Sequence, residues 1–308
     1  MLRGFFLSLS ESRSLRSWAE KSSIGQRLSS RFVAGTHPED VLAAARRTNQ
    51  AGMSVSVDNL GESVTNLEEA RASAALYHQL LDQIAAQELN ANASLKLTHM
   101  GLDVDPAVAE RLVTGLIDKA ASMKPPNFVR VDMEGSAYTQ RTLDFVHALH
   151  RKPENKGCVG AVIQSYMRSA EKDVEGLLAE RIRIRLCKGA YKEPEEIAFQ
   201  EKSEVDANYV KLLKILLKSG VYHGLATHDE KIINQAKQFA ISEKVPREAF
   251  EFQMLFGIRR DLQRQLVRDG WGMRVYIPFG TEWYPYLMRR LAERPANALF
   301  IAKNLFRR

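Results

Sequence analysis

A strand-like stretch, a polar loop and a helix-like segment recur in this order eight times along the 308 residues of the chain. Short apolar or alternating stretches predict strands, and apolar residues spaced three or four apart predict helices. The predicted strands are 54–57, 95–98, 128–131, 159–163, 181–187, 224–226, 250–253 and 273–277. The predicted helices are 38–50, 66–89, 106–123, 138–151, 170–180, 195–219, 230–243, 259–269 and 284–304.

Alternating strands and helices imply a parallel sheet, because each helix carries the chain back to the start of the next strand. Eight such units in about 250 residues match an α/β fold of the (β/α)₈ barrel type. An open doubly wound sheet is the competing architecture, and the absence of a GxGxxG motif after the first strand counts against it. We therefore predict an N-terminal helical segment at 1–50 and a barrel catalytic domain at 51–308.

The composition restricts the class of protein. Lys and Arg exceed Asp and Glu by 44 to 37, for a formal net charge of +7. This excess suits nucleic acid, an anionic membrane surface or small anions, but the cations form no tail, so nucleic acid is not the expected partner. Cys158 and Cys187 are too few for a disulfide framework, which favours a reducing, cytoplasmic compartment. No apolar run reaches the length of a membrane span.

The N-terminal residues 1–19 are rich in Arg and Ser, as presequences are. Glu11 and Glu20 interrupt that pattern, so an amphipathic helix is the favoured interpretation. The histidines lie on separate predicted strands without the spacing of metal ligands, and we expect no metal site.

The stretch 181–191 alternates apolar and basic residues and then breaks into Lys188-Gly189-Ala190-Tyr191. A glycine after a strand lets the backbone approach a ligand closely. Pro194 and the acidic residues beside it predict the first turn of a helix. Cations, a glycine and a helix N-terminus in this order indicate an anionic ligand.

Polar side chains follow most of the predicted strands. In barrels of this type the carboxyl ends of the strands carry the active site. The residues at these ends are Glu62, Lys96, His99, Asp132, Glu134, Gln164, Arg185, Lys188, Thr227, His228, Leu255 and Tyr276. Together they predict one polar pocket at one mouth of the barrel.

Several of these residues also suit a structural role. Lys96 alternates with Leu95 and Leu97 and therefore points into the barrel, where Asp132 is a plausible partner. That pair is either a structural ion pair or part of a binding site, and a structural role is the simplest one for His99 and His228. On the last helix, Arg289 and Arg290 are either solvated or form a fork for a carboxylate.

At this point the motifs resemble those of the proline dehydrogenase family, and the likeness is to its monofunctional bacterial type. The matching stretches run in order over almost the whole predicted barrel: RFVAG (31–35), KLTHMG (96–101), VRVDMEGS (129–136), VIQSYM (162–167), RLCKGAY (185–191), ATHD (226–229), FEFQMLFG (250–257), RVYIPFG (274–280) and YLMRRLAER (286–294).

The resemblance implies a distorted barrel with FAD at the strand ends and L-proline beside it. The implied residues that contact proline are Lys96, oriented by Asp132, with Tyr276, Leu255, Arg289, Arg290 and Glu293. The implied residues that bind FAD are Gln164, Arg185, Lys188, Gly189, Ala190, Tyr191, Thr227 and His228. Glu62 is similar to a carboxylate that closes the site against an arginine of the last helix, here Arg289. Cys187 replaces an aliphatic residue usual in the family.

The implied reaction oxidises L-proline to Δ1-pyrroline-5-carboxylate, the first step of proline catabolism, and passes the electrons to a quinone. A separate pyrroline-5-carboxylate dehydrogenase is expected, because this length has no room for a second catalytic domain. Quinone use implies peripheral contact with the inner face of a membrane, for which the basic N-terminal segment is a candidate. The competing functions are a Schiff-base lyase using Lys96 or Lys188 and a basic module that binds nucleic acid or membrane.

Overall fold

The computed structural model describes residues 19, 22, 25, 29–61 and 63–293. The side chains of 289–293 lie outside that description. Within it, eight parallel strands pair in chain order and close on themselves. The strands are β1 (Ser54–Asn59), β2 (Ala91–Leu95), β3 (Val129–Val131), β4 (Val159–Gln164), β5 (Arg183–Cys187), β6 (His223–Ala226), β7 (Phe250–Leu255) and β8 (Gly272–Phe279). The predicted (β/α)₈ barrel is confirmed.

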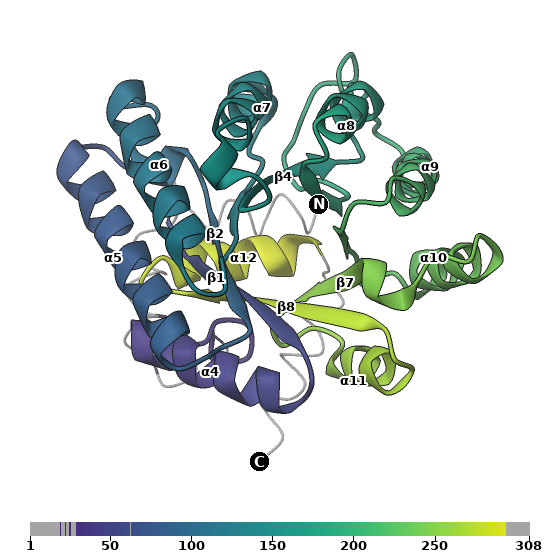
Figure 1. Cartoon of the computed structure of the whole chain (residues 1–308), viewed down its shortest axis with the longest axis horizontal. Helices are drawn as coiled ribbons and strands as arrows, with labels where there is room; N and C mark the ends of the chain where they lie inside the picture. The colour runs from purple at the N-terminus through teal and green to yellow at the C-terminus, as the bar shows by residue number, and fades with distance from the viewer. Residues whose placement is uncertain (1–18, 20–21, 23–24, 26–28, 62, 294–308) are drawn as a thin grey trace.

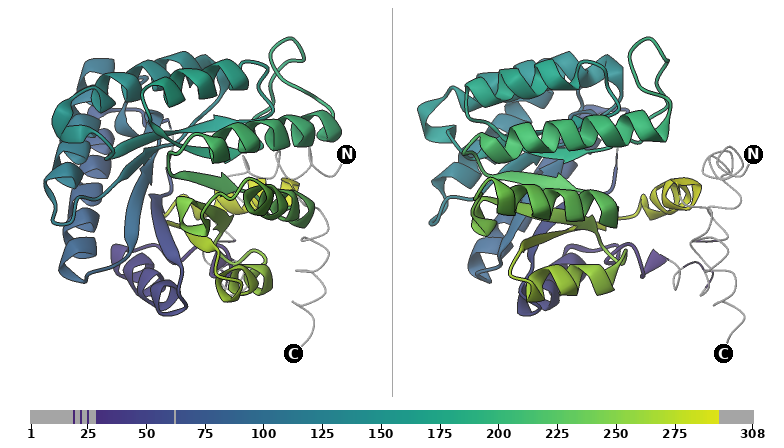
Figure 2. Two further views of the ribbon diagram at one scale, coloured as in Figure 1. Left: turned by 45° about the vertical axis from the view of Figure 1, so that its right-hand side comes forward. Right: turned by 90° about the vertical axis from the view of Figure 1, so that its right-hand side faces the viewer.

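The helices form a ring around this barrel, with one exception (Figure 1). The helices are α4 (Pro38–Gln50), α5 (Leu67–Ala86), α6 (Pro106–Ser122), α7 (Ser136–His150), α8 (Ala170–Ala179), α9 (Lys202–Lys218), α10 (Glu230–Ser242), α11 (Arg260–Arg268) and α12 (Trp283–Glu293). Helix α4, which precedes the first strand, lies in the ring between α5 and α11. Helix α12 instead lies beyond the strand ends at one mouth of the barrel (Figure 2). The barrel is therefore distorted where its last helix leaves the ring.

The strands alternate in a way that puts polar groups inside the barrel. In β1, Val55 and Val57 are buried in the main apolar core, whereas Ser56 and Asp58 alternate with them. Successive side chains of a strand point to opposite faces, so the polar set faces the barrel interior and the apolar set faces the helices. The register continues this arrangement, because Ser56 pairs with both Asn92 and Tyr276.

A second apolar cluster holds α12 across the mouth. Trp283, Tyr284, Tyr286 and Leu287 of this helix pack with Leu60, which follows β1, and with an upstream segment that includes Phe32. These aromatic side chains explain why α12 leaves the ring, because they bury their apolar surface against the end of the barrel.

Two predicted boundaries are wrong by four residues or more. The second strand is Ala91–Leu95 instead of 95–98, because small and polar residues of low strand propensity form it and Thr98–Met100 is a 3-10 turn. The helix after β5 begins at Lys202 instead of 195. Glu193 does not open that helix: its carboxylate accepts hydrogen bonds from the backbone N–H and hydroxyl of Ser136, at 2.7 and 2.6 Å, and so caps α7.

Candidate active site

One cavity of about 440 Å³ opens at the carboxyl ends of the strands. It lies at the mouth to which the sequence assigned the site. The predicted site residues that line it are Lys96, Asp132, Gln164, Arg185, Lys188, Gly189, Ala190, Tyr191, Thr227, His228, Leu255 and Tyr276. The structure thus brings together twelve of the predicted residues, whereas His99 and Glu134, which were predicted for the same pocket, do not line this cavity.

An ion pair between Arg185 and Asp132 forms the floor of this cavity. Both residues are buried, and Arg185 Nη1 lies 2.7 Å from Asp132 Oδ1. The same carboxylate oxygen accepts a hydrogen bond of 2.7 Å from the Ser94 hydroxyl, and Asp132 Oδ2 accepts one of 3.0 Å from Tyr276. A buried carboxylate needs such partners, and these contacts link β2, β5 and β8 to Asp132 at the end of β3.

Arg185 is held from further sides as well. Its Nε donates to Gln253 Oε1 at 2.6 Å and its Nη2 donates to Ser56 Oγ at 3.2 Å. Gln253 in turn donates to Glu251 Oε1 at 2.7 Å, which fixes the direction of its amide. The guanidinium is therefore fixed in position by residues of the barrel interior.

The buried layer below, toward the start of the strands, is also charged. Arg274 Nε donates to Glu251 at 2.6 Å, and Tyr222 donates to the other oxygen at 2.8 Å. Although burial raises the pKa of Glu251, Arg274 and the hydrogen bonds together lower it below its usual value. Glu251 is therefore ionised and neutralises Arg274 at the base of the site.

The carboxylate beside Lys96 is Asp58, which corrects the predicted pairing of Lys96 with Asp132. Lys96 Nζ lies 3.5 Å from Asp58 Oδ2, whereas the oxygens of Asp132 are occupied by Arg185, Ser94 and Tyr276. The register explains the difference, because Asp58 pairs with Ser94, two residues before Lys96 on the same face. Burial raises the pKa of Asp58 above its usual value, and Lys96 opposes this shift.

Tyr276 closes the same group of side chains from β8. Its ring lies under the Arg185 guanidinium, with the Arg185 Cζ 5.1 Å from the ring centroid. Burial, together with the charges of Asp132 and Asp58, raises the pKa of Tyr276 well above its usual value. Tyr276 therefore stays protonated and acts as a hydrogen-bond donor to Asp132.

Lys188 lies at the opposite side of the cavity, between two carboxylates. Its Nζ is 2.5 Å from Asp206 on α9 and 3.1 Å from Asp229. Asp229 also caps α10 through the backbone N–H of Lys231. Although burial raises the pKa of Asp229, Lys188 brings it below its usual value. Lys202 also pairs with Asp206 and lies 3.6 Å from Asp229, so two lysines balance two carboxylates at this side of the cavity.

Backbone conformation shapes the wall that contains Gly189. This residue has a φ of +105°, and a Cβ there would lie 2.1 Å from the ring of Tyr166. Any other residue would be strained and would collide with Tyr166, so the chain needs glycine to turn past the ring.

His228, which follows β6, contacts the neighbouring strand β7. Its Nε2 accepts a hydrogen bond of 3.0 Å from the backbone N–H of Leu255, which joins two cavity-lining residues.

Four predicted residues cannot be placed by their side chains. Arg289, Arg290 and Glu293 belong to α12, which lies at the mouth, but their side chains are outside the described residues. Glu62, the predicted gate partner of Arg289, is outside them entirely. Their predicted roles stay predictions.

Four residues that contact predicted site residues were not themselves predicted: Asp58, Ser94, Gln253 and Asp206. For three of them the sequence contains a pattern that indicates their position. Asp58, Ser94 and Gln253 occupy the same strand face as residues that were selected, so strict period-two counting would have found them. Asp206 lies on a helix, and its contact with Lys188 depends on packing that no local pattern encodes.

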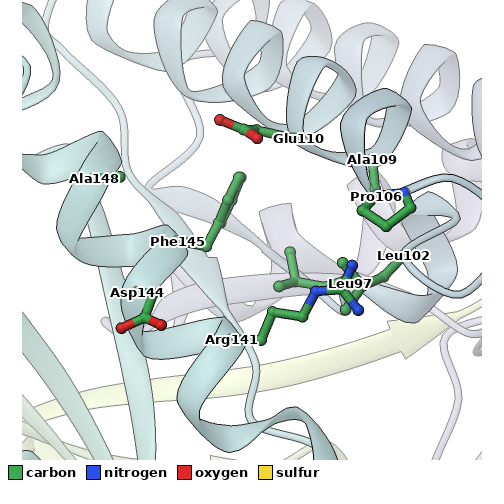
Figure 3. Close-up of a pocket in the computed structure, with 9 residues that line it drawn as sticks. All are labelled: Leu97, Leu102, Pro106, Ala109, Glu110, Arg141, Asp144, Phe145 and Ala148. Carbon is green, nitrogen blue, oxygen red and sulfur yellow. The ribbon is translucent and has the colours of Figure 1, made fainter.

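Other features of the described chain lie elsewhere. A hollow of about 260 Å³ lies between α6 and α7 on the outside of the barrel, with Glu110, Arg141 and Asp144 around it (Figure 3). No group of three or more His, Cys, Asp or Glu side chains suited to a metal occurs in the described residues. Among the same residues, no helix combines the length and apolar character required to cross a bilayer.

Comparison with known proteins gives consistent matches. Residues 41–303 match the family model described as proline dehydrogenase. The chain belongs to the proline dehydrogenase family. It is 41% identical over 307 residues to proline dehydrogenase 2 of Bacillus subtilis, covering 98% of each chain. It is 36% identical over 281 residues to the proline dehydrogenase of Deinococcus radiodurans, covering 91% of this chain and 90% of that one.

A solved member of the family has the same fold. Proline utilization A (PutA) from Bdellovibrio bacteriovorus, crystallised after inactivation by N-propargylglycine, superposes with a TM-score of 0.82 at 25% identity. The match covers 92% of this chain and 34% of that longer protein. The barrel described above is therefore the barrel of the proline dehydrogenase family.

Proposed function

We propose that this chain is an FAD-dependent proline dehydrogenase that oxidises L-proline to Δ1-pyrroline-5-carboxylate, the first step of proline catabolism. The observation that carries the proposal is the cavity at the strand ends, which is lined by twelve of the residues predicted for these roles. Its cations suit two anionic groups, the carboxylate of the substrate and the phosphates of a dinucleotide.

The residues present fit FAD. The cavity volume of about 440 Å³ is within the usual range of cofactor and ligand pockets. Gln164 donates its amide to the carbonyl of Glu134 at 2.9 Å, and its Oε1 has no donor among the described residues, so it can accept a ring N–H. Gly189 and Ala190 line the cavity without a large side chain. Gln164, Arg185, Lys188, Gly189, Ala190, Tyr191, Thr227 and His228 would hold the cofactor, which supplies a two-electron acceptor for the hydride of the proline ring.

The substrate would bind through its carboxylate. In this proposal Lys96 and the paired Arg289 and Arg290 hold that group, and Tyr276 and Leu255 enclose the apolar ring. Glu293 completes the pocket. Asp58 holds Lys96 in the barrel interior. Cations in a site that excludes water bind a carboxylate more strongly than they do in bulk solvent, so these residues would also orient the ring carbon for hydride transfer.

Arg185 would stabilise negative charge on the reduced cofactor. It lies beneath the cavity and is fixed by Asp132, Gln253 and Ser56. A cation that does not have to reorganise during the reaction contributes the most to electrostatic stabilisation. The electrons then pass to a quinone, and a separate pyrroline-5-carboxylate dehydrogenase consumes the product in the cytoplasm.

A visible absorption spectrum tests this proposal most directly. Protein purified with FAD is expected to show flavin bands that bleach when L-proline is added without oxygen. A colourless protein that fails to reduce a dye with proline after FAD is resupplied contradicts the proposal. An adduct trapped by borohydride would favour a Schiff-base lyase instead.

The two arginines of α12 give the first prediction. Arg289→Met or Arg290→Met is expected to raise KM for proline at least about ten-fold, because each removes a charge-assisted contact to the carboxylate. The FAD spectrum and affinity should stay unchanged, since the proposal places neither arginine against the cofactor. Steady-state kinetics at matched flavin content measures the effect. Unchanged KM in both variants would remove the carboxylate-fork assignment.

The gate gives the second prediction. Glu62→Ala is expected to weaken proline binding a few-fold while the rate of flavin reduction at saturating proline stays similar, because closure and not chemistry is affected. Stopped-flow reduction at several proline concentrations separates the two quantities. Glu62→Gln is the matched control that keeps the size of the side chain. Unaltered proline affinity in both variants would argue against a gate.

The N-terminal segment gives the third prediction. Deletion of residues 1–30 is expected to reduce binding to vesicles that contain phosphatidylglycerol, because the segment is basic and the vesicle surface is anionic. Co-sedimentation with these vesicles and with neutral phosphatidylcholine vesicles measures the difference. Equal sedimentation of the full and truncated chains would show that the segment is not the membrane contact.

A further inference from the structure

A second hollow lies between α4 and α11, outside the barrel, with a volume of about 410 Å³. Apolar side chains form much of its lining, and polar and basic side chains surround them. The lining residues are Ser30, Ala44, Arg47, Thr48, Ala51, Met53, Phe256, Gly257, Arg260, Gln263, Arg264 and Val275. None of the residues predicted from the sequence lines this α4/α11 hollow.

The charged side chains that line the α4/α11 hollow are all basic. Arg47, Arg260 and Arg264 line it, and no Asp or Glu of the described residues does. Arg260 and Arg264 are one helical turn apart and therefore project from the same face of α11. The Arg260 guanidinium lies 5.5 Å from the ring centroid of Phe256, which places it at the hollow.

The three arginines also differ from those exposed cations of the molecule that form ion pairs. Arg151 pairs with Glu180, Lys211 with Glu171 and Lys218 with Glu243, at 2.5, 2.5 and 3.0 Å. Within the part of the chain that the structure describes, Arg47, Arg260 and Arg264 form no such pair. The α6/α7 hollow also differs, because Glu110 and Asp144 accompany its single arginine. Positive side chains around a hollow that has no acidic side chain create a positive electrostatic potential, which a bound anion would neutralise.

We propose that the α4/α11 hollow binds a small organic phosphate. Guanidinium groups bind phosphate oxygens in pairs of parallel hydrogen bonds, and a phosphate carries enough charge to engage more than one arginine. The apolar lining, which includes Met53, Phe256 and Val275, suits the carbon part of such a ligand. The volume is larger than a bare ion requires and falls within the range of small-molecule pockets.

The hollow is separate from the candidate active site but shares a loop with it. Phe256 and Gly257 directly follow Leu255, which lines the active-site cavity. Gln263 of α11 donates its amide to the carbonyls of both Leu255 and Ile258, at 3.2 and 2.8 Å. A ligand in the hollow would therefore contact the reverse side of the segment that carries Leu255.

Isothermal titration of the full chain, saturated with FAD so that the active-site cavity is filled, tests the proposal. The probes are inorganic pyrophosphate and adenosine 5′-monophosphate. One saturable site is expected, and the triple variant R47Q/R260Q/R264Q should bind at least about ten-fold more weakly, since it removes the charged donors. The matched control is R151Q/K211Q/K218Q, which removes three exposed cations elsewhere and should bind within about two-fold of the original chain.

The outcomes separate the possible sources of phosphate. Absence of saturable binding, or equal weakening in both triple variants, overturns the proposal, because the effect would then be one of net charge. Sedimentation with phosphatidylglycerol vesicles forms the second arm. The vesicles could bind through the three arginines while neither soluble probe binds. That result also overturns the proposal and favours a contact with lipid headgroups. The titration does not require proline oxidation. The two triple variants are also compared on the chain without FAD, so the result does not depend on the proposed function.

Discussion

Replacement of Arg185 by methionine is expected to lower kcat/KM for proline by about a hundred-fold or more, because it removes a preorganised cation beneath the proposed cofactor site. It is also expected to lower the free energy of unfolding by about 3 kcal/mol, because it leaves a buried carboxylate without its charge partner. Arg185 and Asp132 are both buried and lie 2.7 Å apart. Proline kinetics and urea unfolding of the same preparation measure the two losses.

A second substitution separates these two losses. In R185M/D132N the buried negative charge is gone, and the asparagine still accepts a hydrogen bond from Ser94 or Tyr276. Stability should recover by a large part of the loss, whereas activity should not recover, since the cation is still absent. Recovery of both would mean that Arg185 acts on activity only through the fold. Loss of neither in R185M would remove the assigned role of Arg185 altogether.

The fold was predictable because its signals are local and repeated. Each of the eight strands is short and bounded by polar residues, and caps such as Asp105 before α6 mark where helices begin. The errors occurred where local signals point the wrong way. Residues 91–94 are small or polar and still form a strand, because their neighbours β1 and β3 supply the hydrogen bonds. Pro194 and Glu193 resemble a helix start, but a distant helix uses the carboxylate.

The site was predictable to the extent that it depends on topology. A parallel barrel brings the ends of all strands to one mouth, so Lys96, Arg185 and His228 had to converge whatever their spacing in the chain. Which residues pair at that mouth depends on register instead. Register placed Asp58 beside Lys96 and left Asp132 to Arg185, and a one-residue uncertainty in strand position is enough to hide this choice.

The stability of the barrel is expected to fall as the pH drops below about 6.5, and His223 is the histidine whose pKa is lowered most. The residue is buried, its Nδ1 accepts the backbone N–H of Ile184 at 3.0 Å, and its Nε2 lies 2.9 Å from the Ser219 hydroxyl. Burial, followed by the charge of Arg130, lowers the pKa of His223 from 6.5 to about 3. A proton on Nδ1 would face the N–H of Ile184, so the folded state holds the ring neutral.

The sign of the effect follows from proton binding. Below pH 6.5 the unfolded chain takes up a proton at His223, and the folded chain does not until the pH approaches 3. The unfolded state is therefore favoured by about 1.4 kcal/mol for each pH unit in this window, and the effect disappears above pH 7. Carboxylates titrate in the lower part of the same window, so the comparison must be made against a variant.

His223→Asn is the suitable variant, because its side-chain oxygen can accept the Ile184 N–H in place of Nδ1 and does not titrate. The free energy of unfolding in urea, measured from pH 7.5 to 5, should fall more steeply for the original chain than for H223N. The difference between the two curves should be constant above pH 7 and should grow toward pH 5. Parallel curves over this range would contradict the prediction, because they would mean that His223 is protonated equally in the folded and unfolded states.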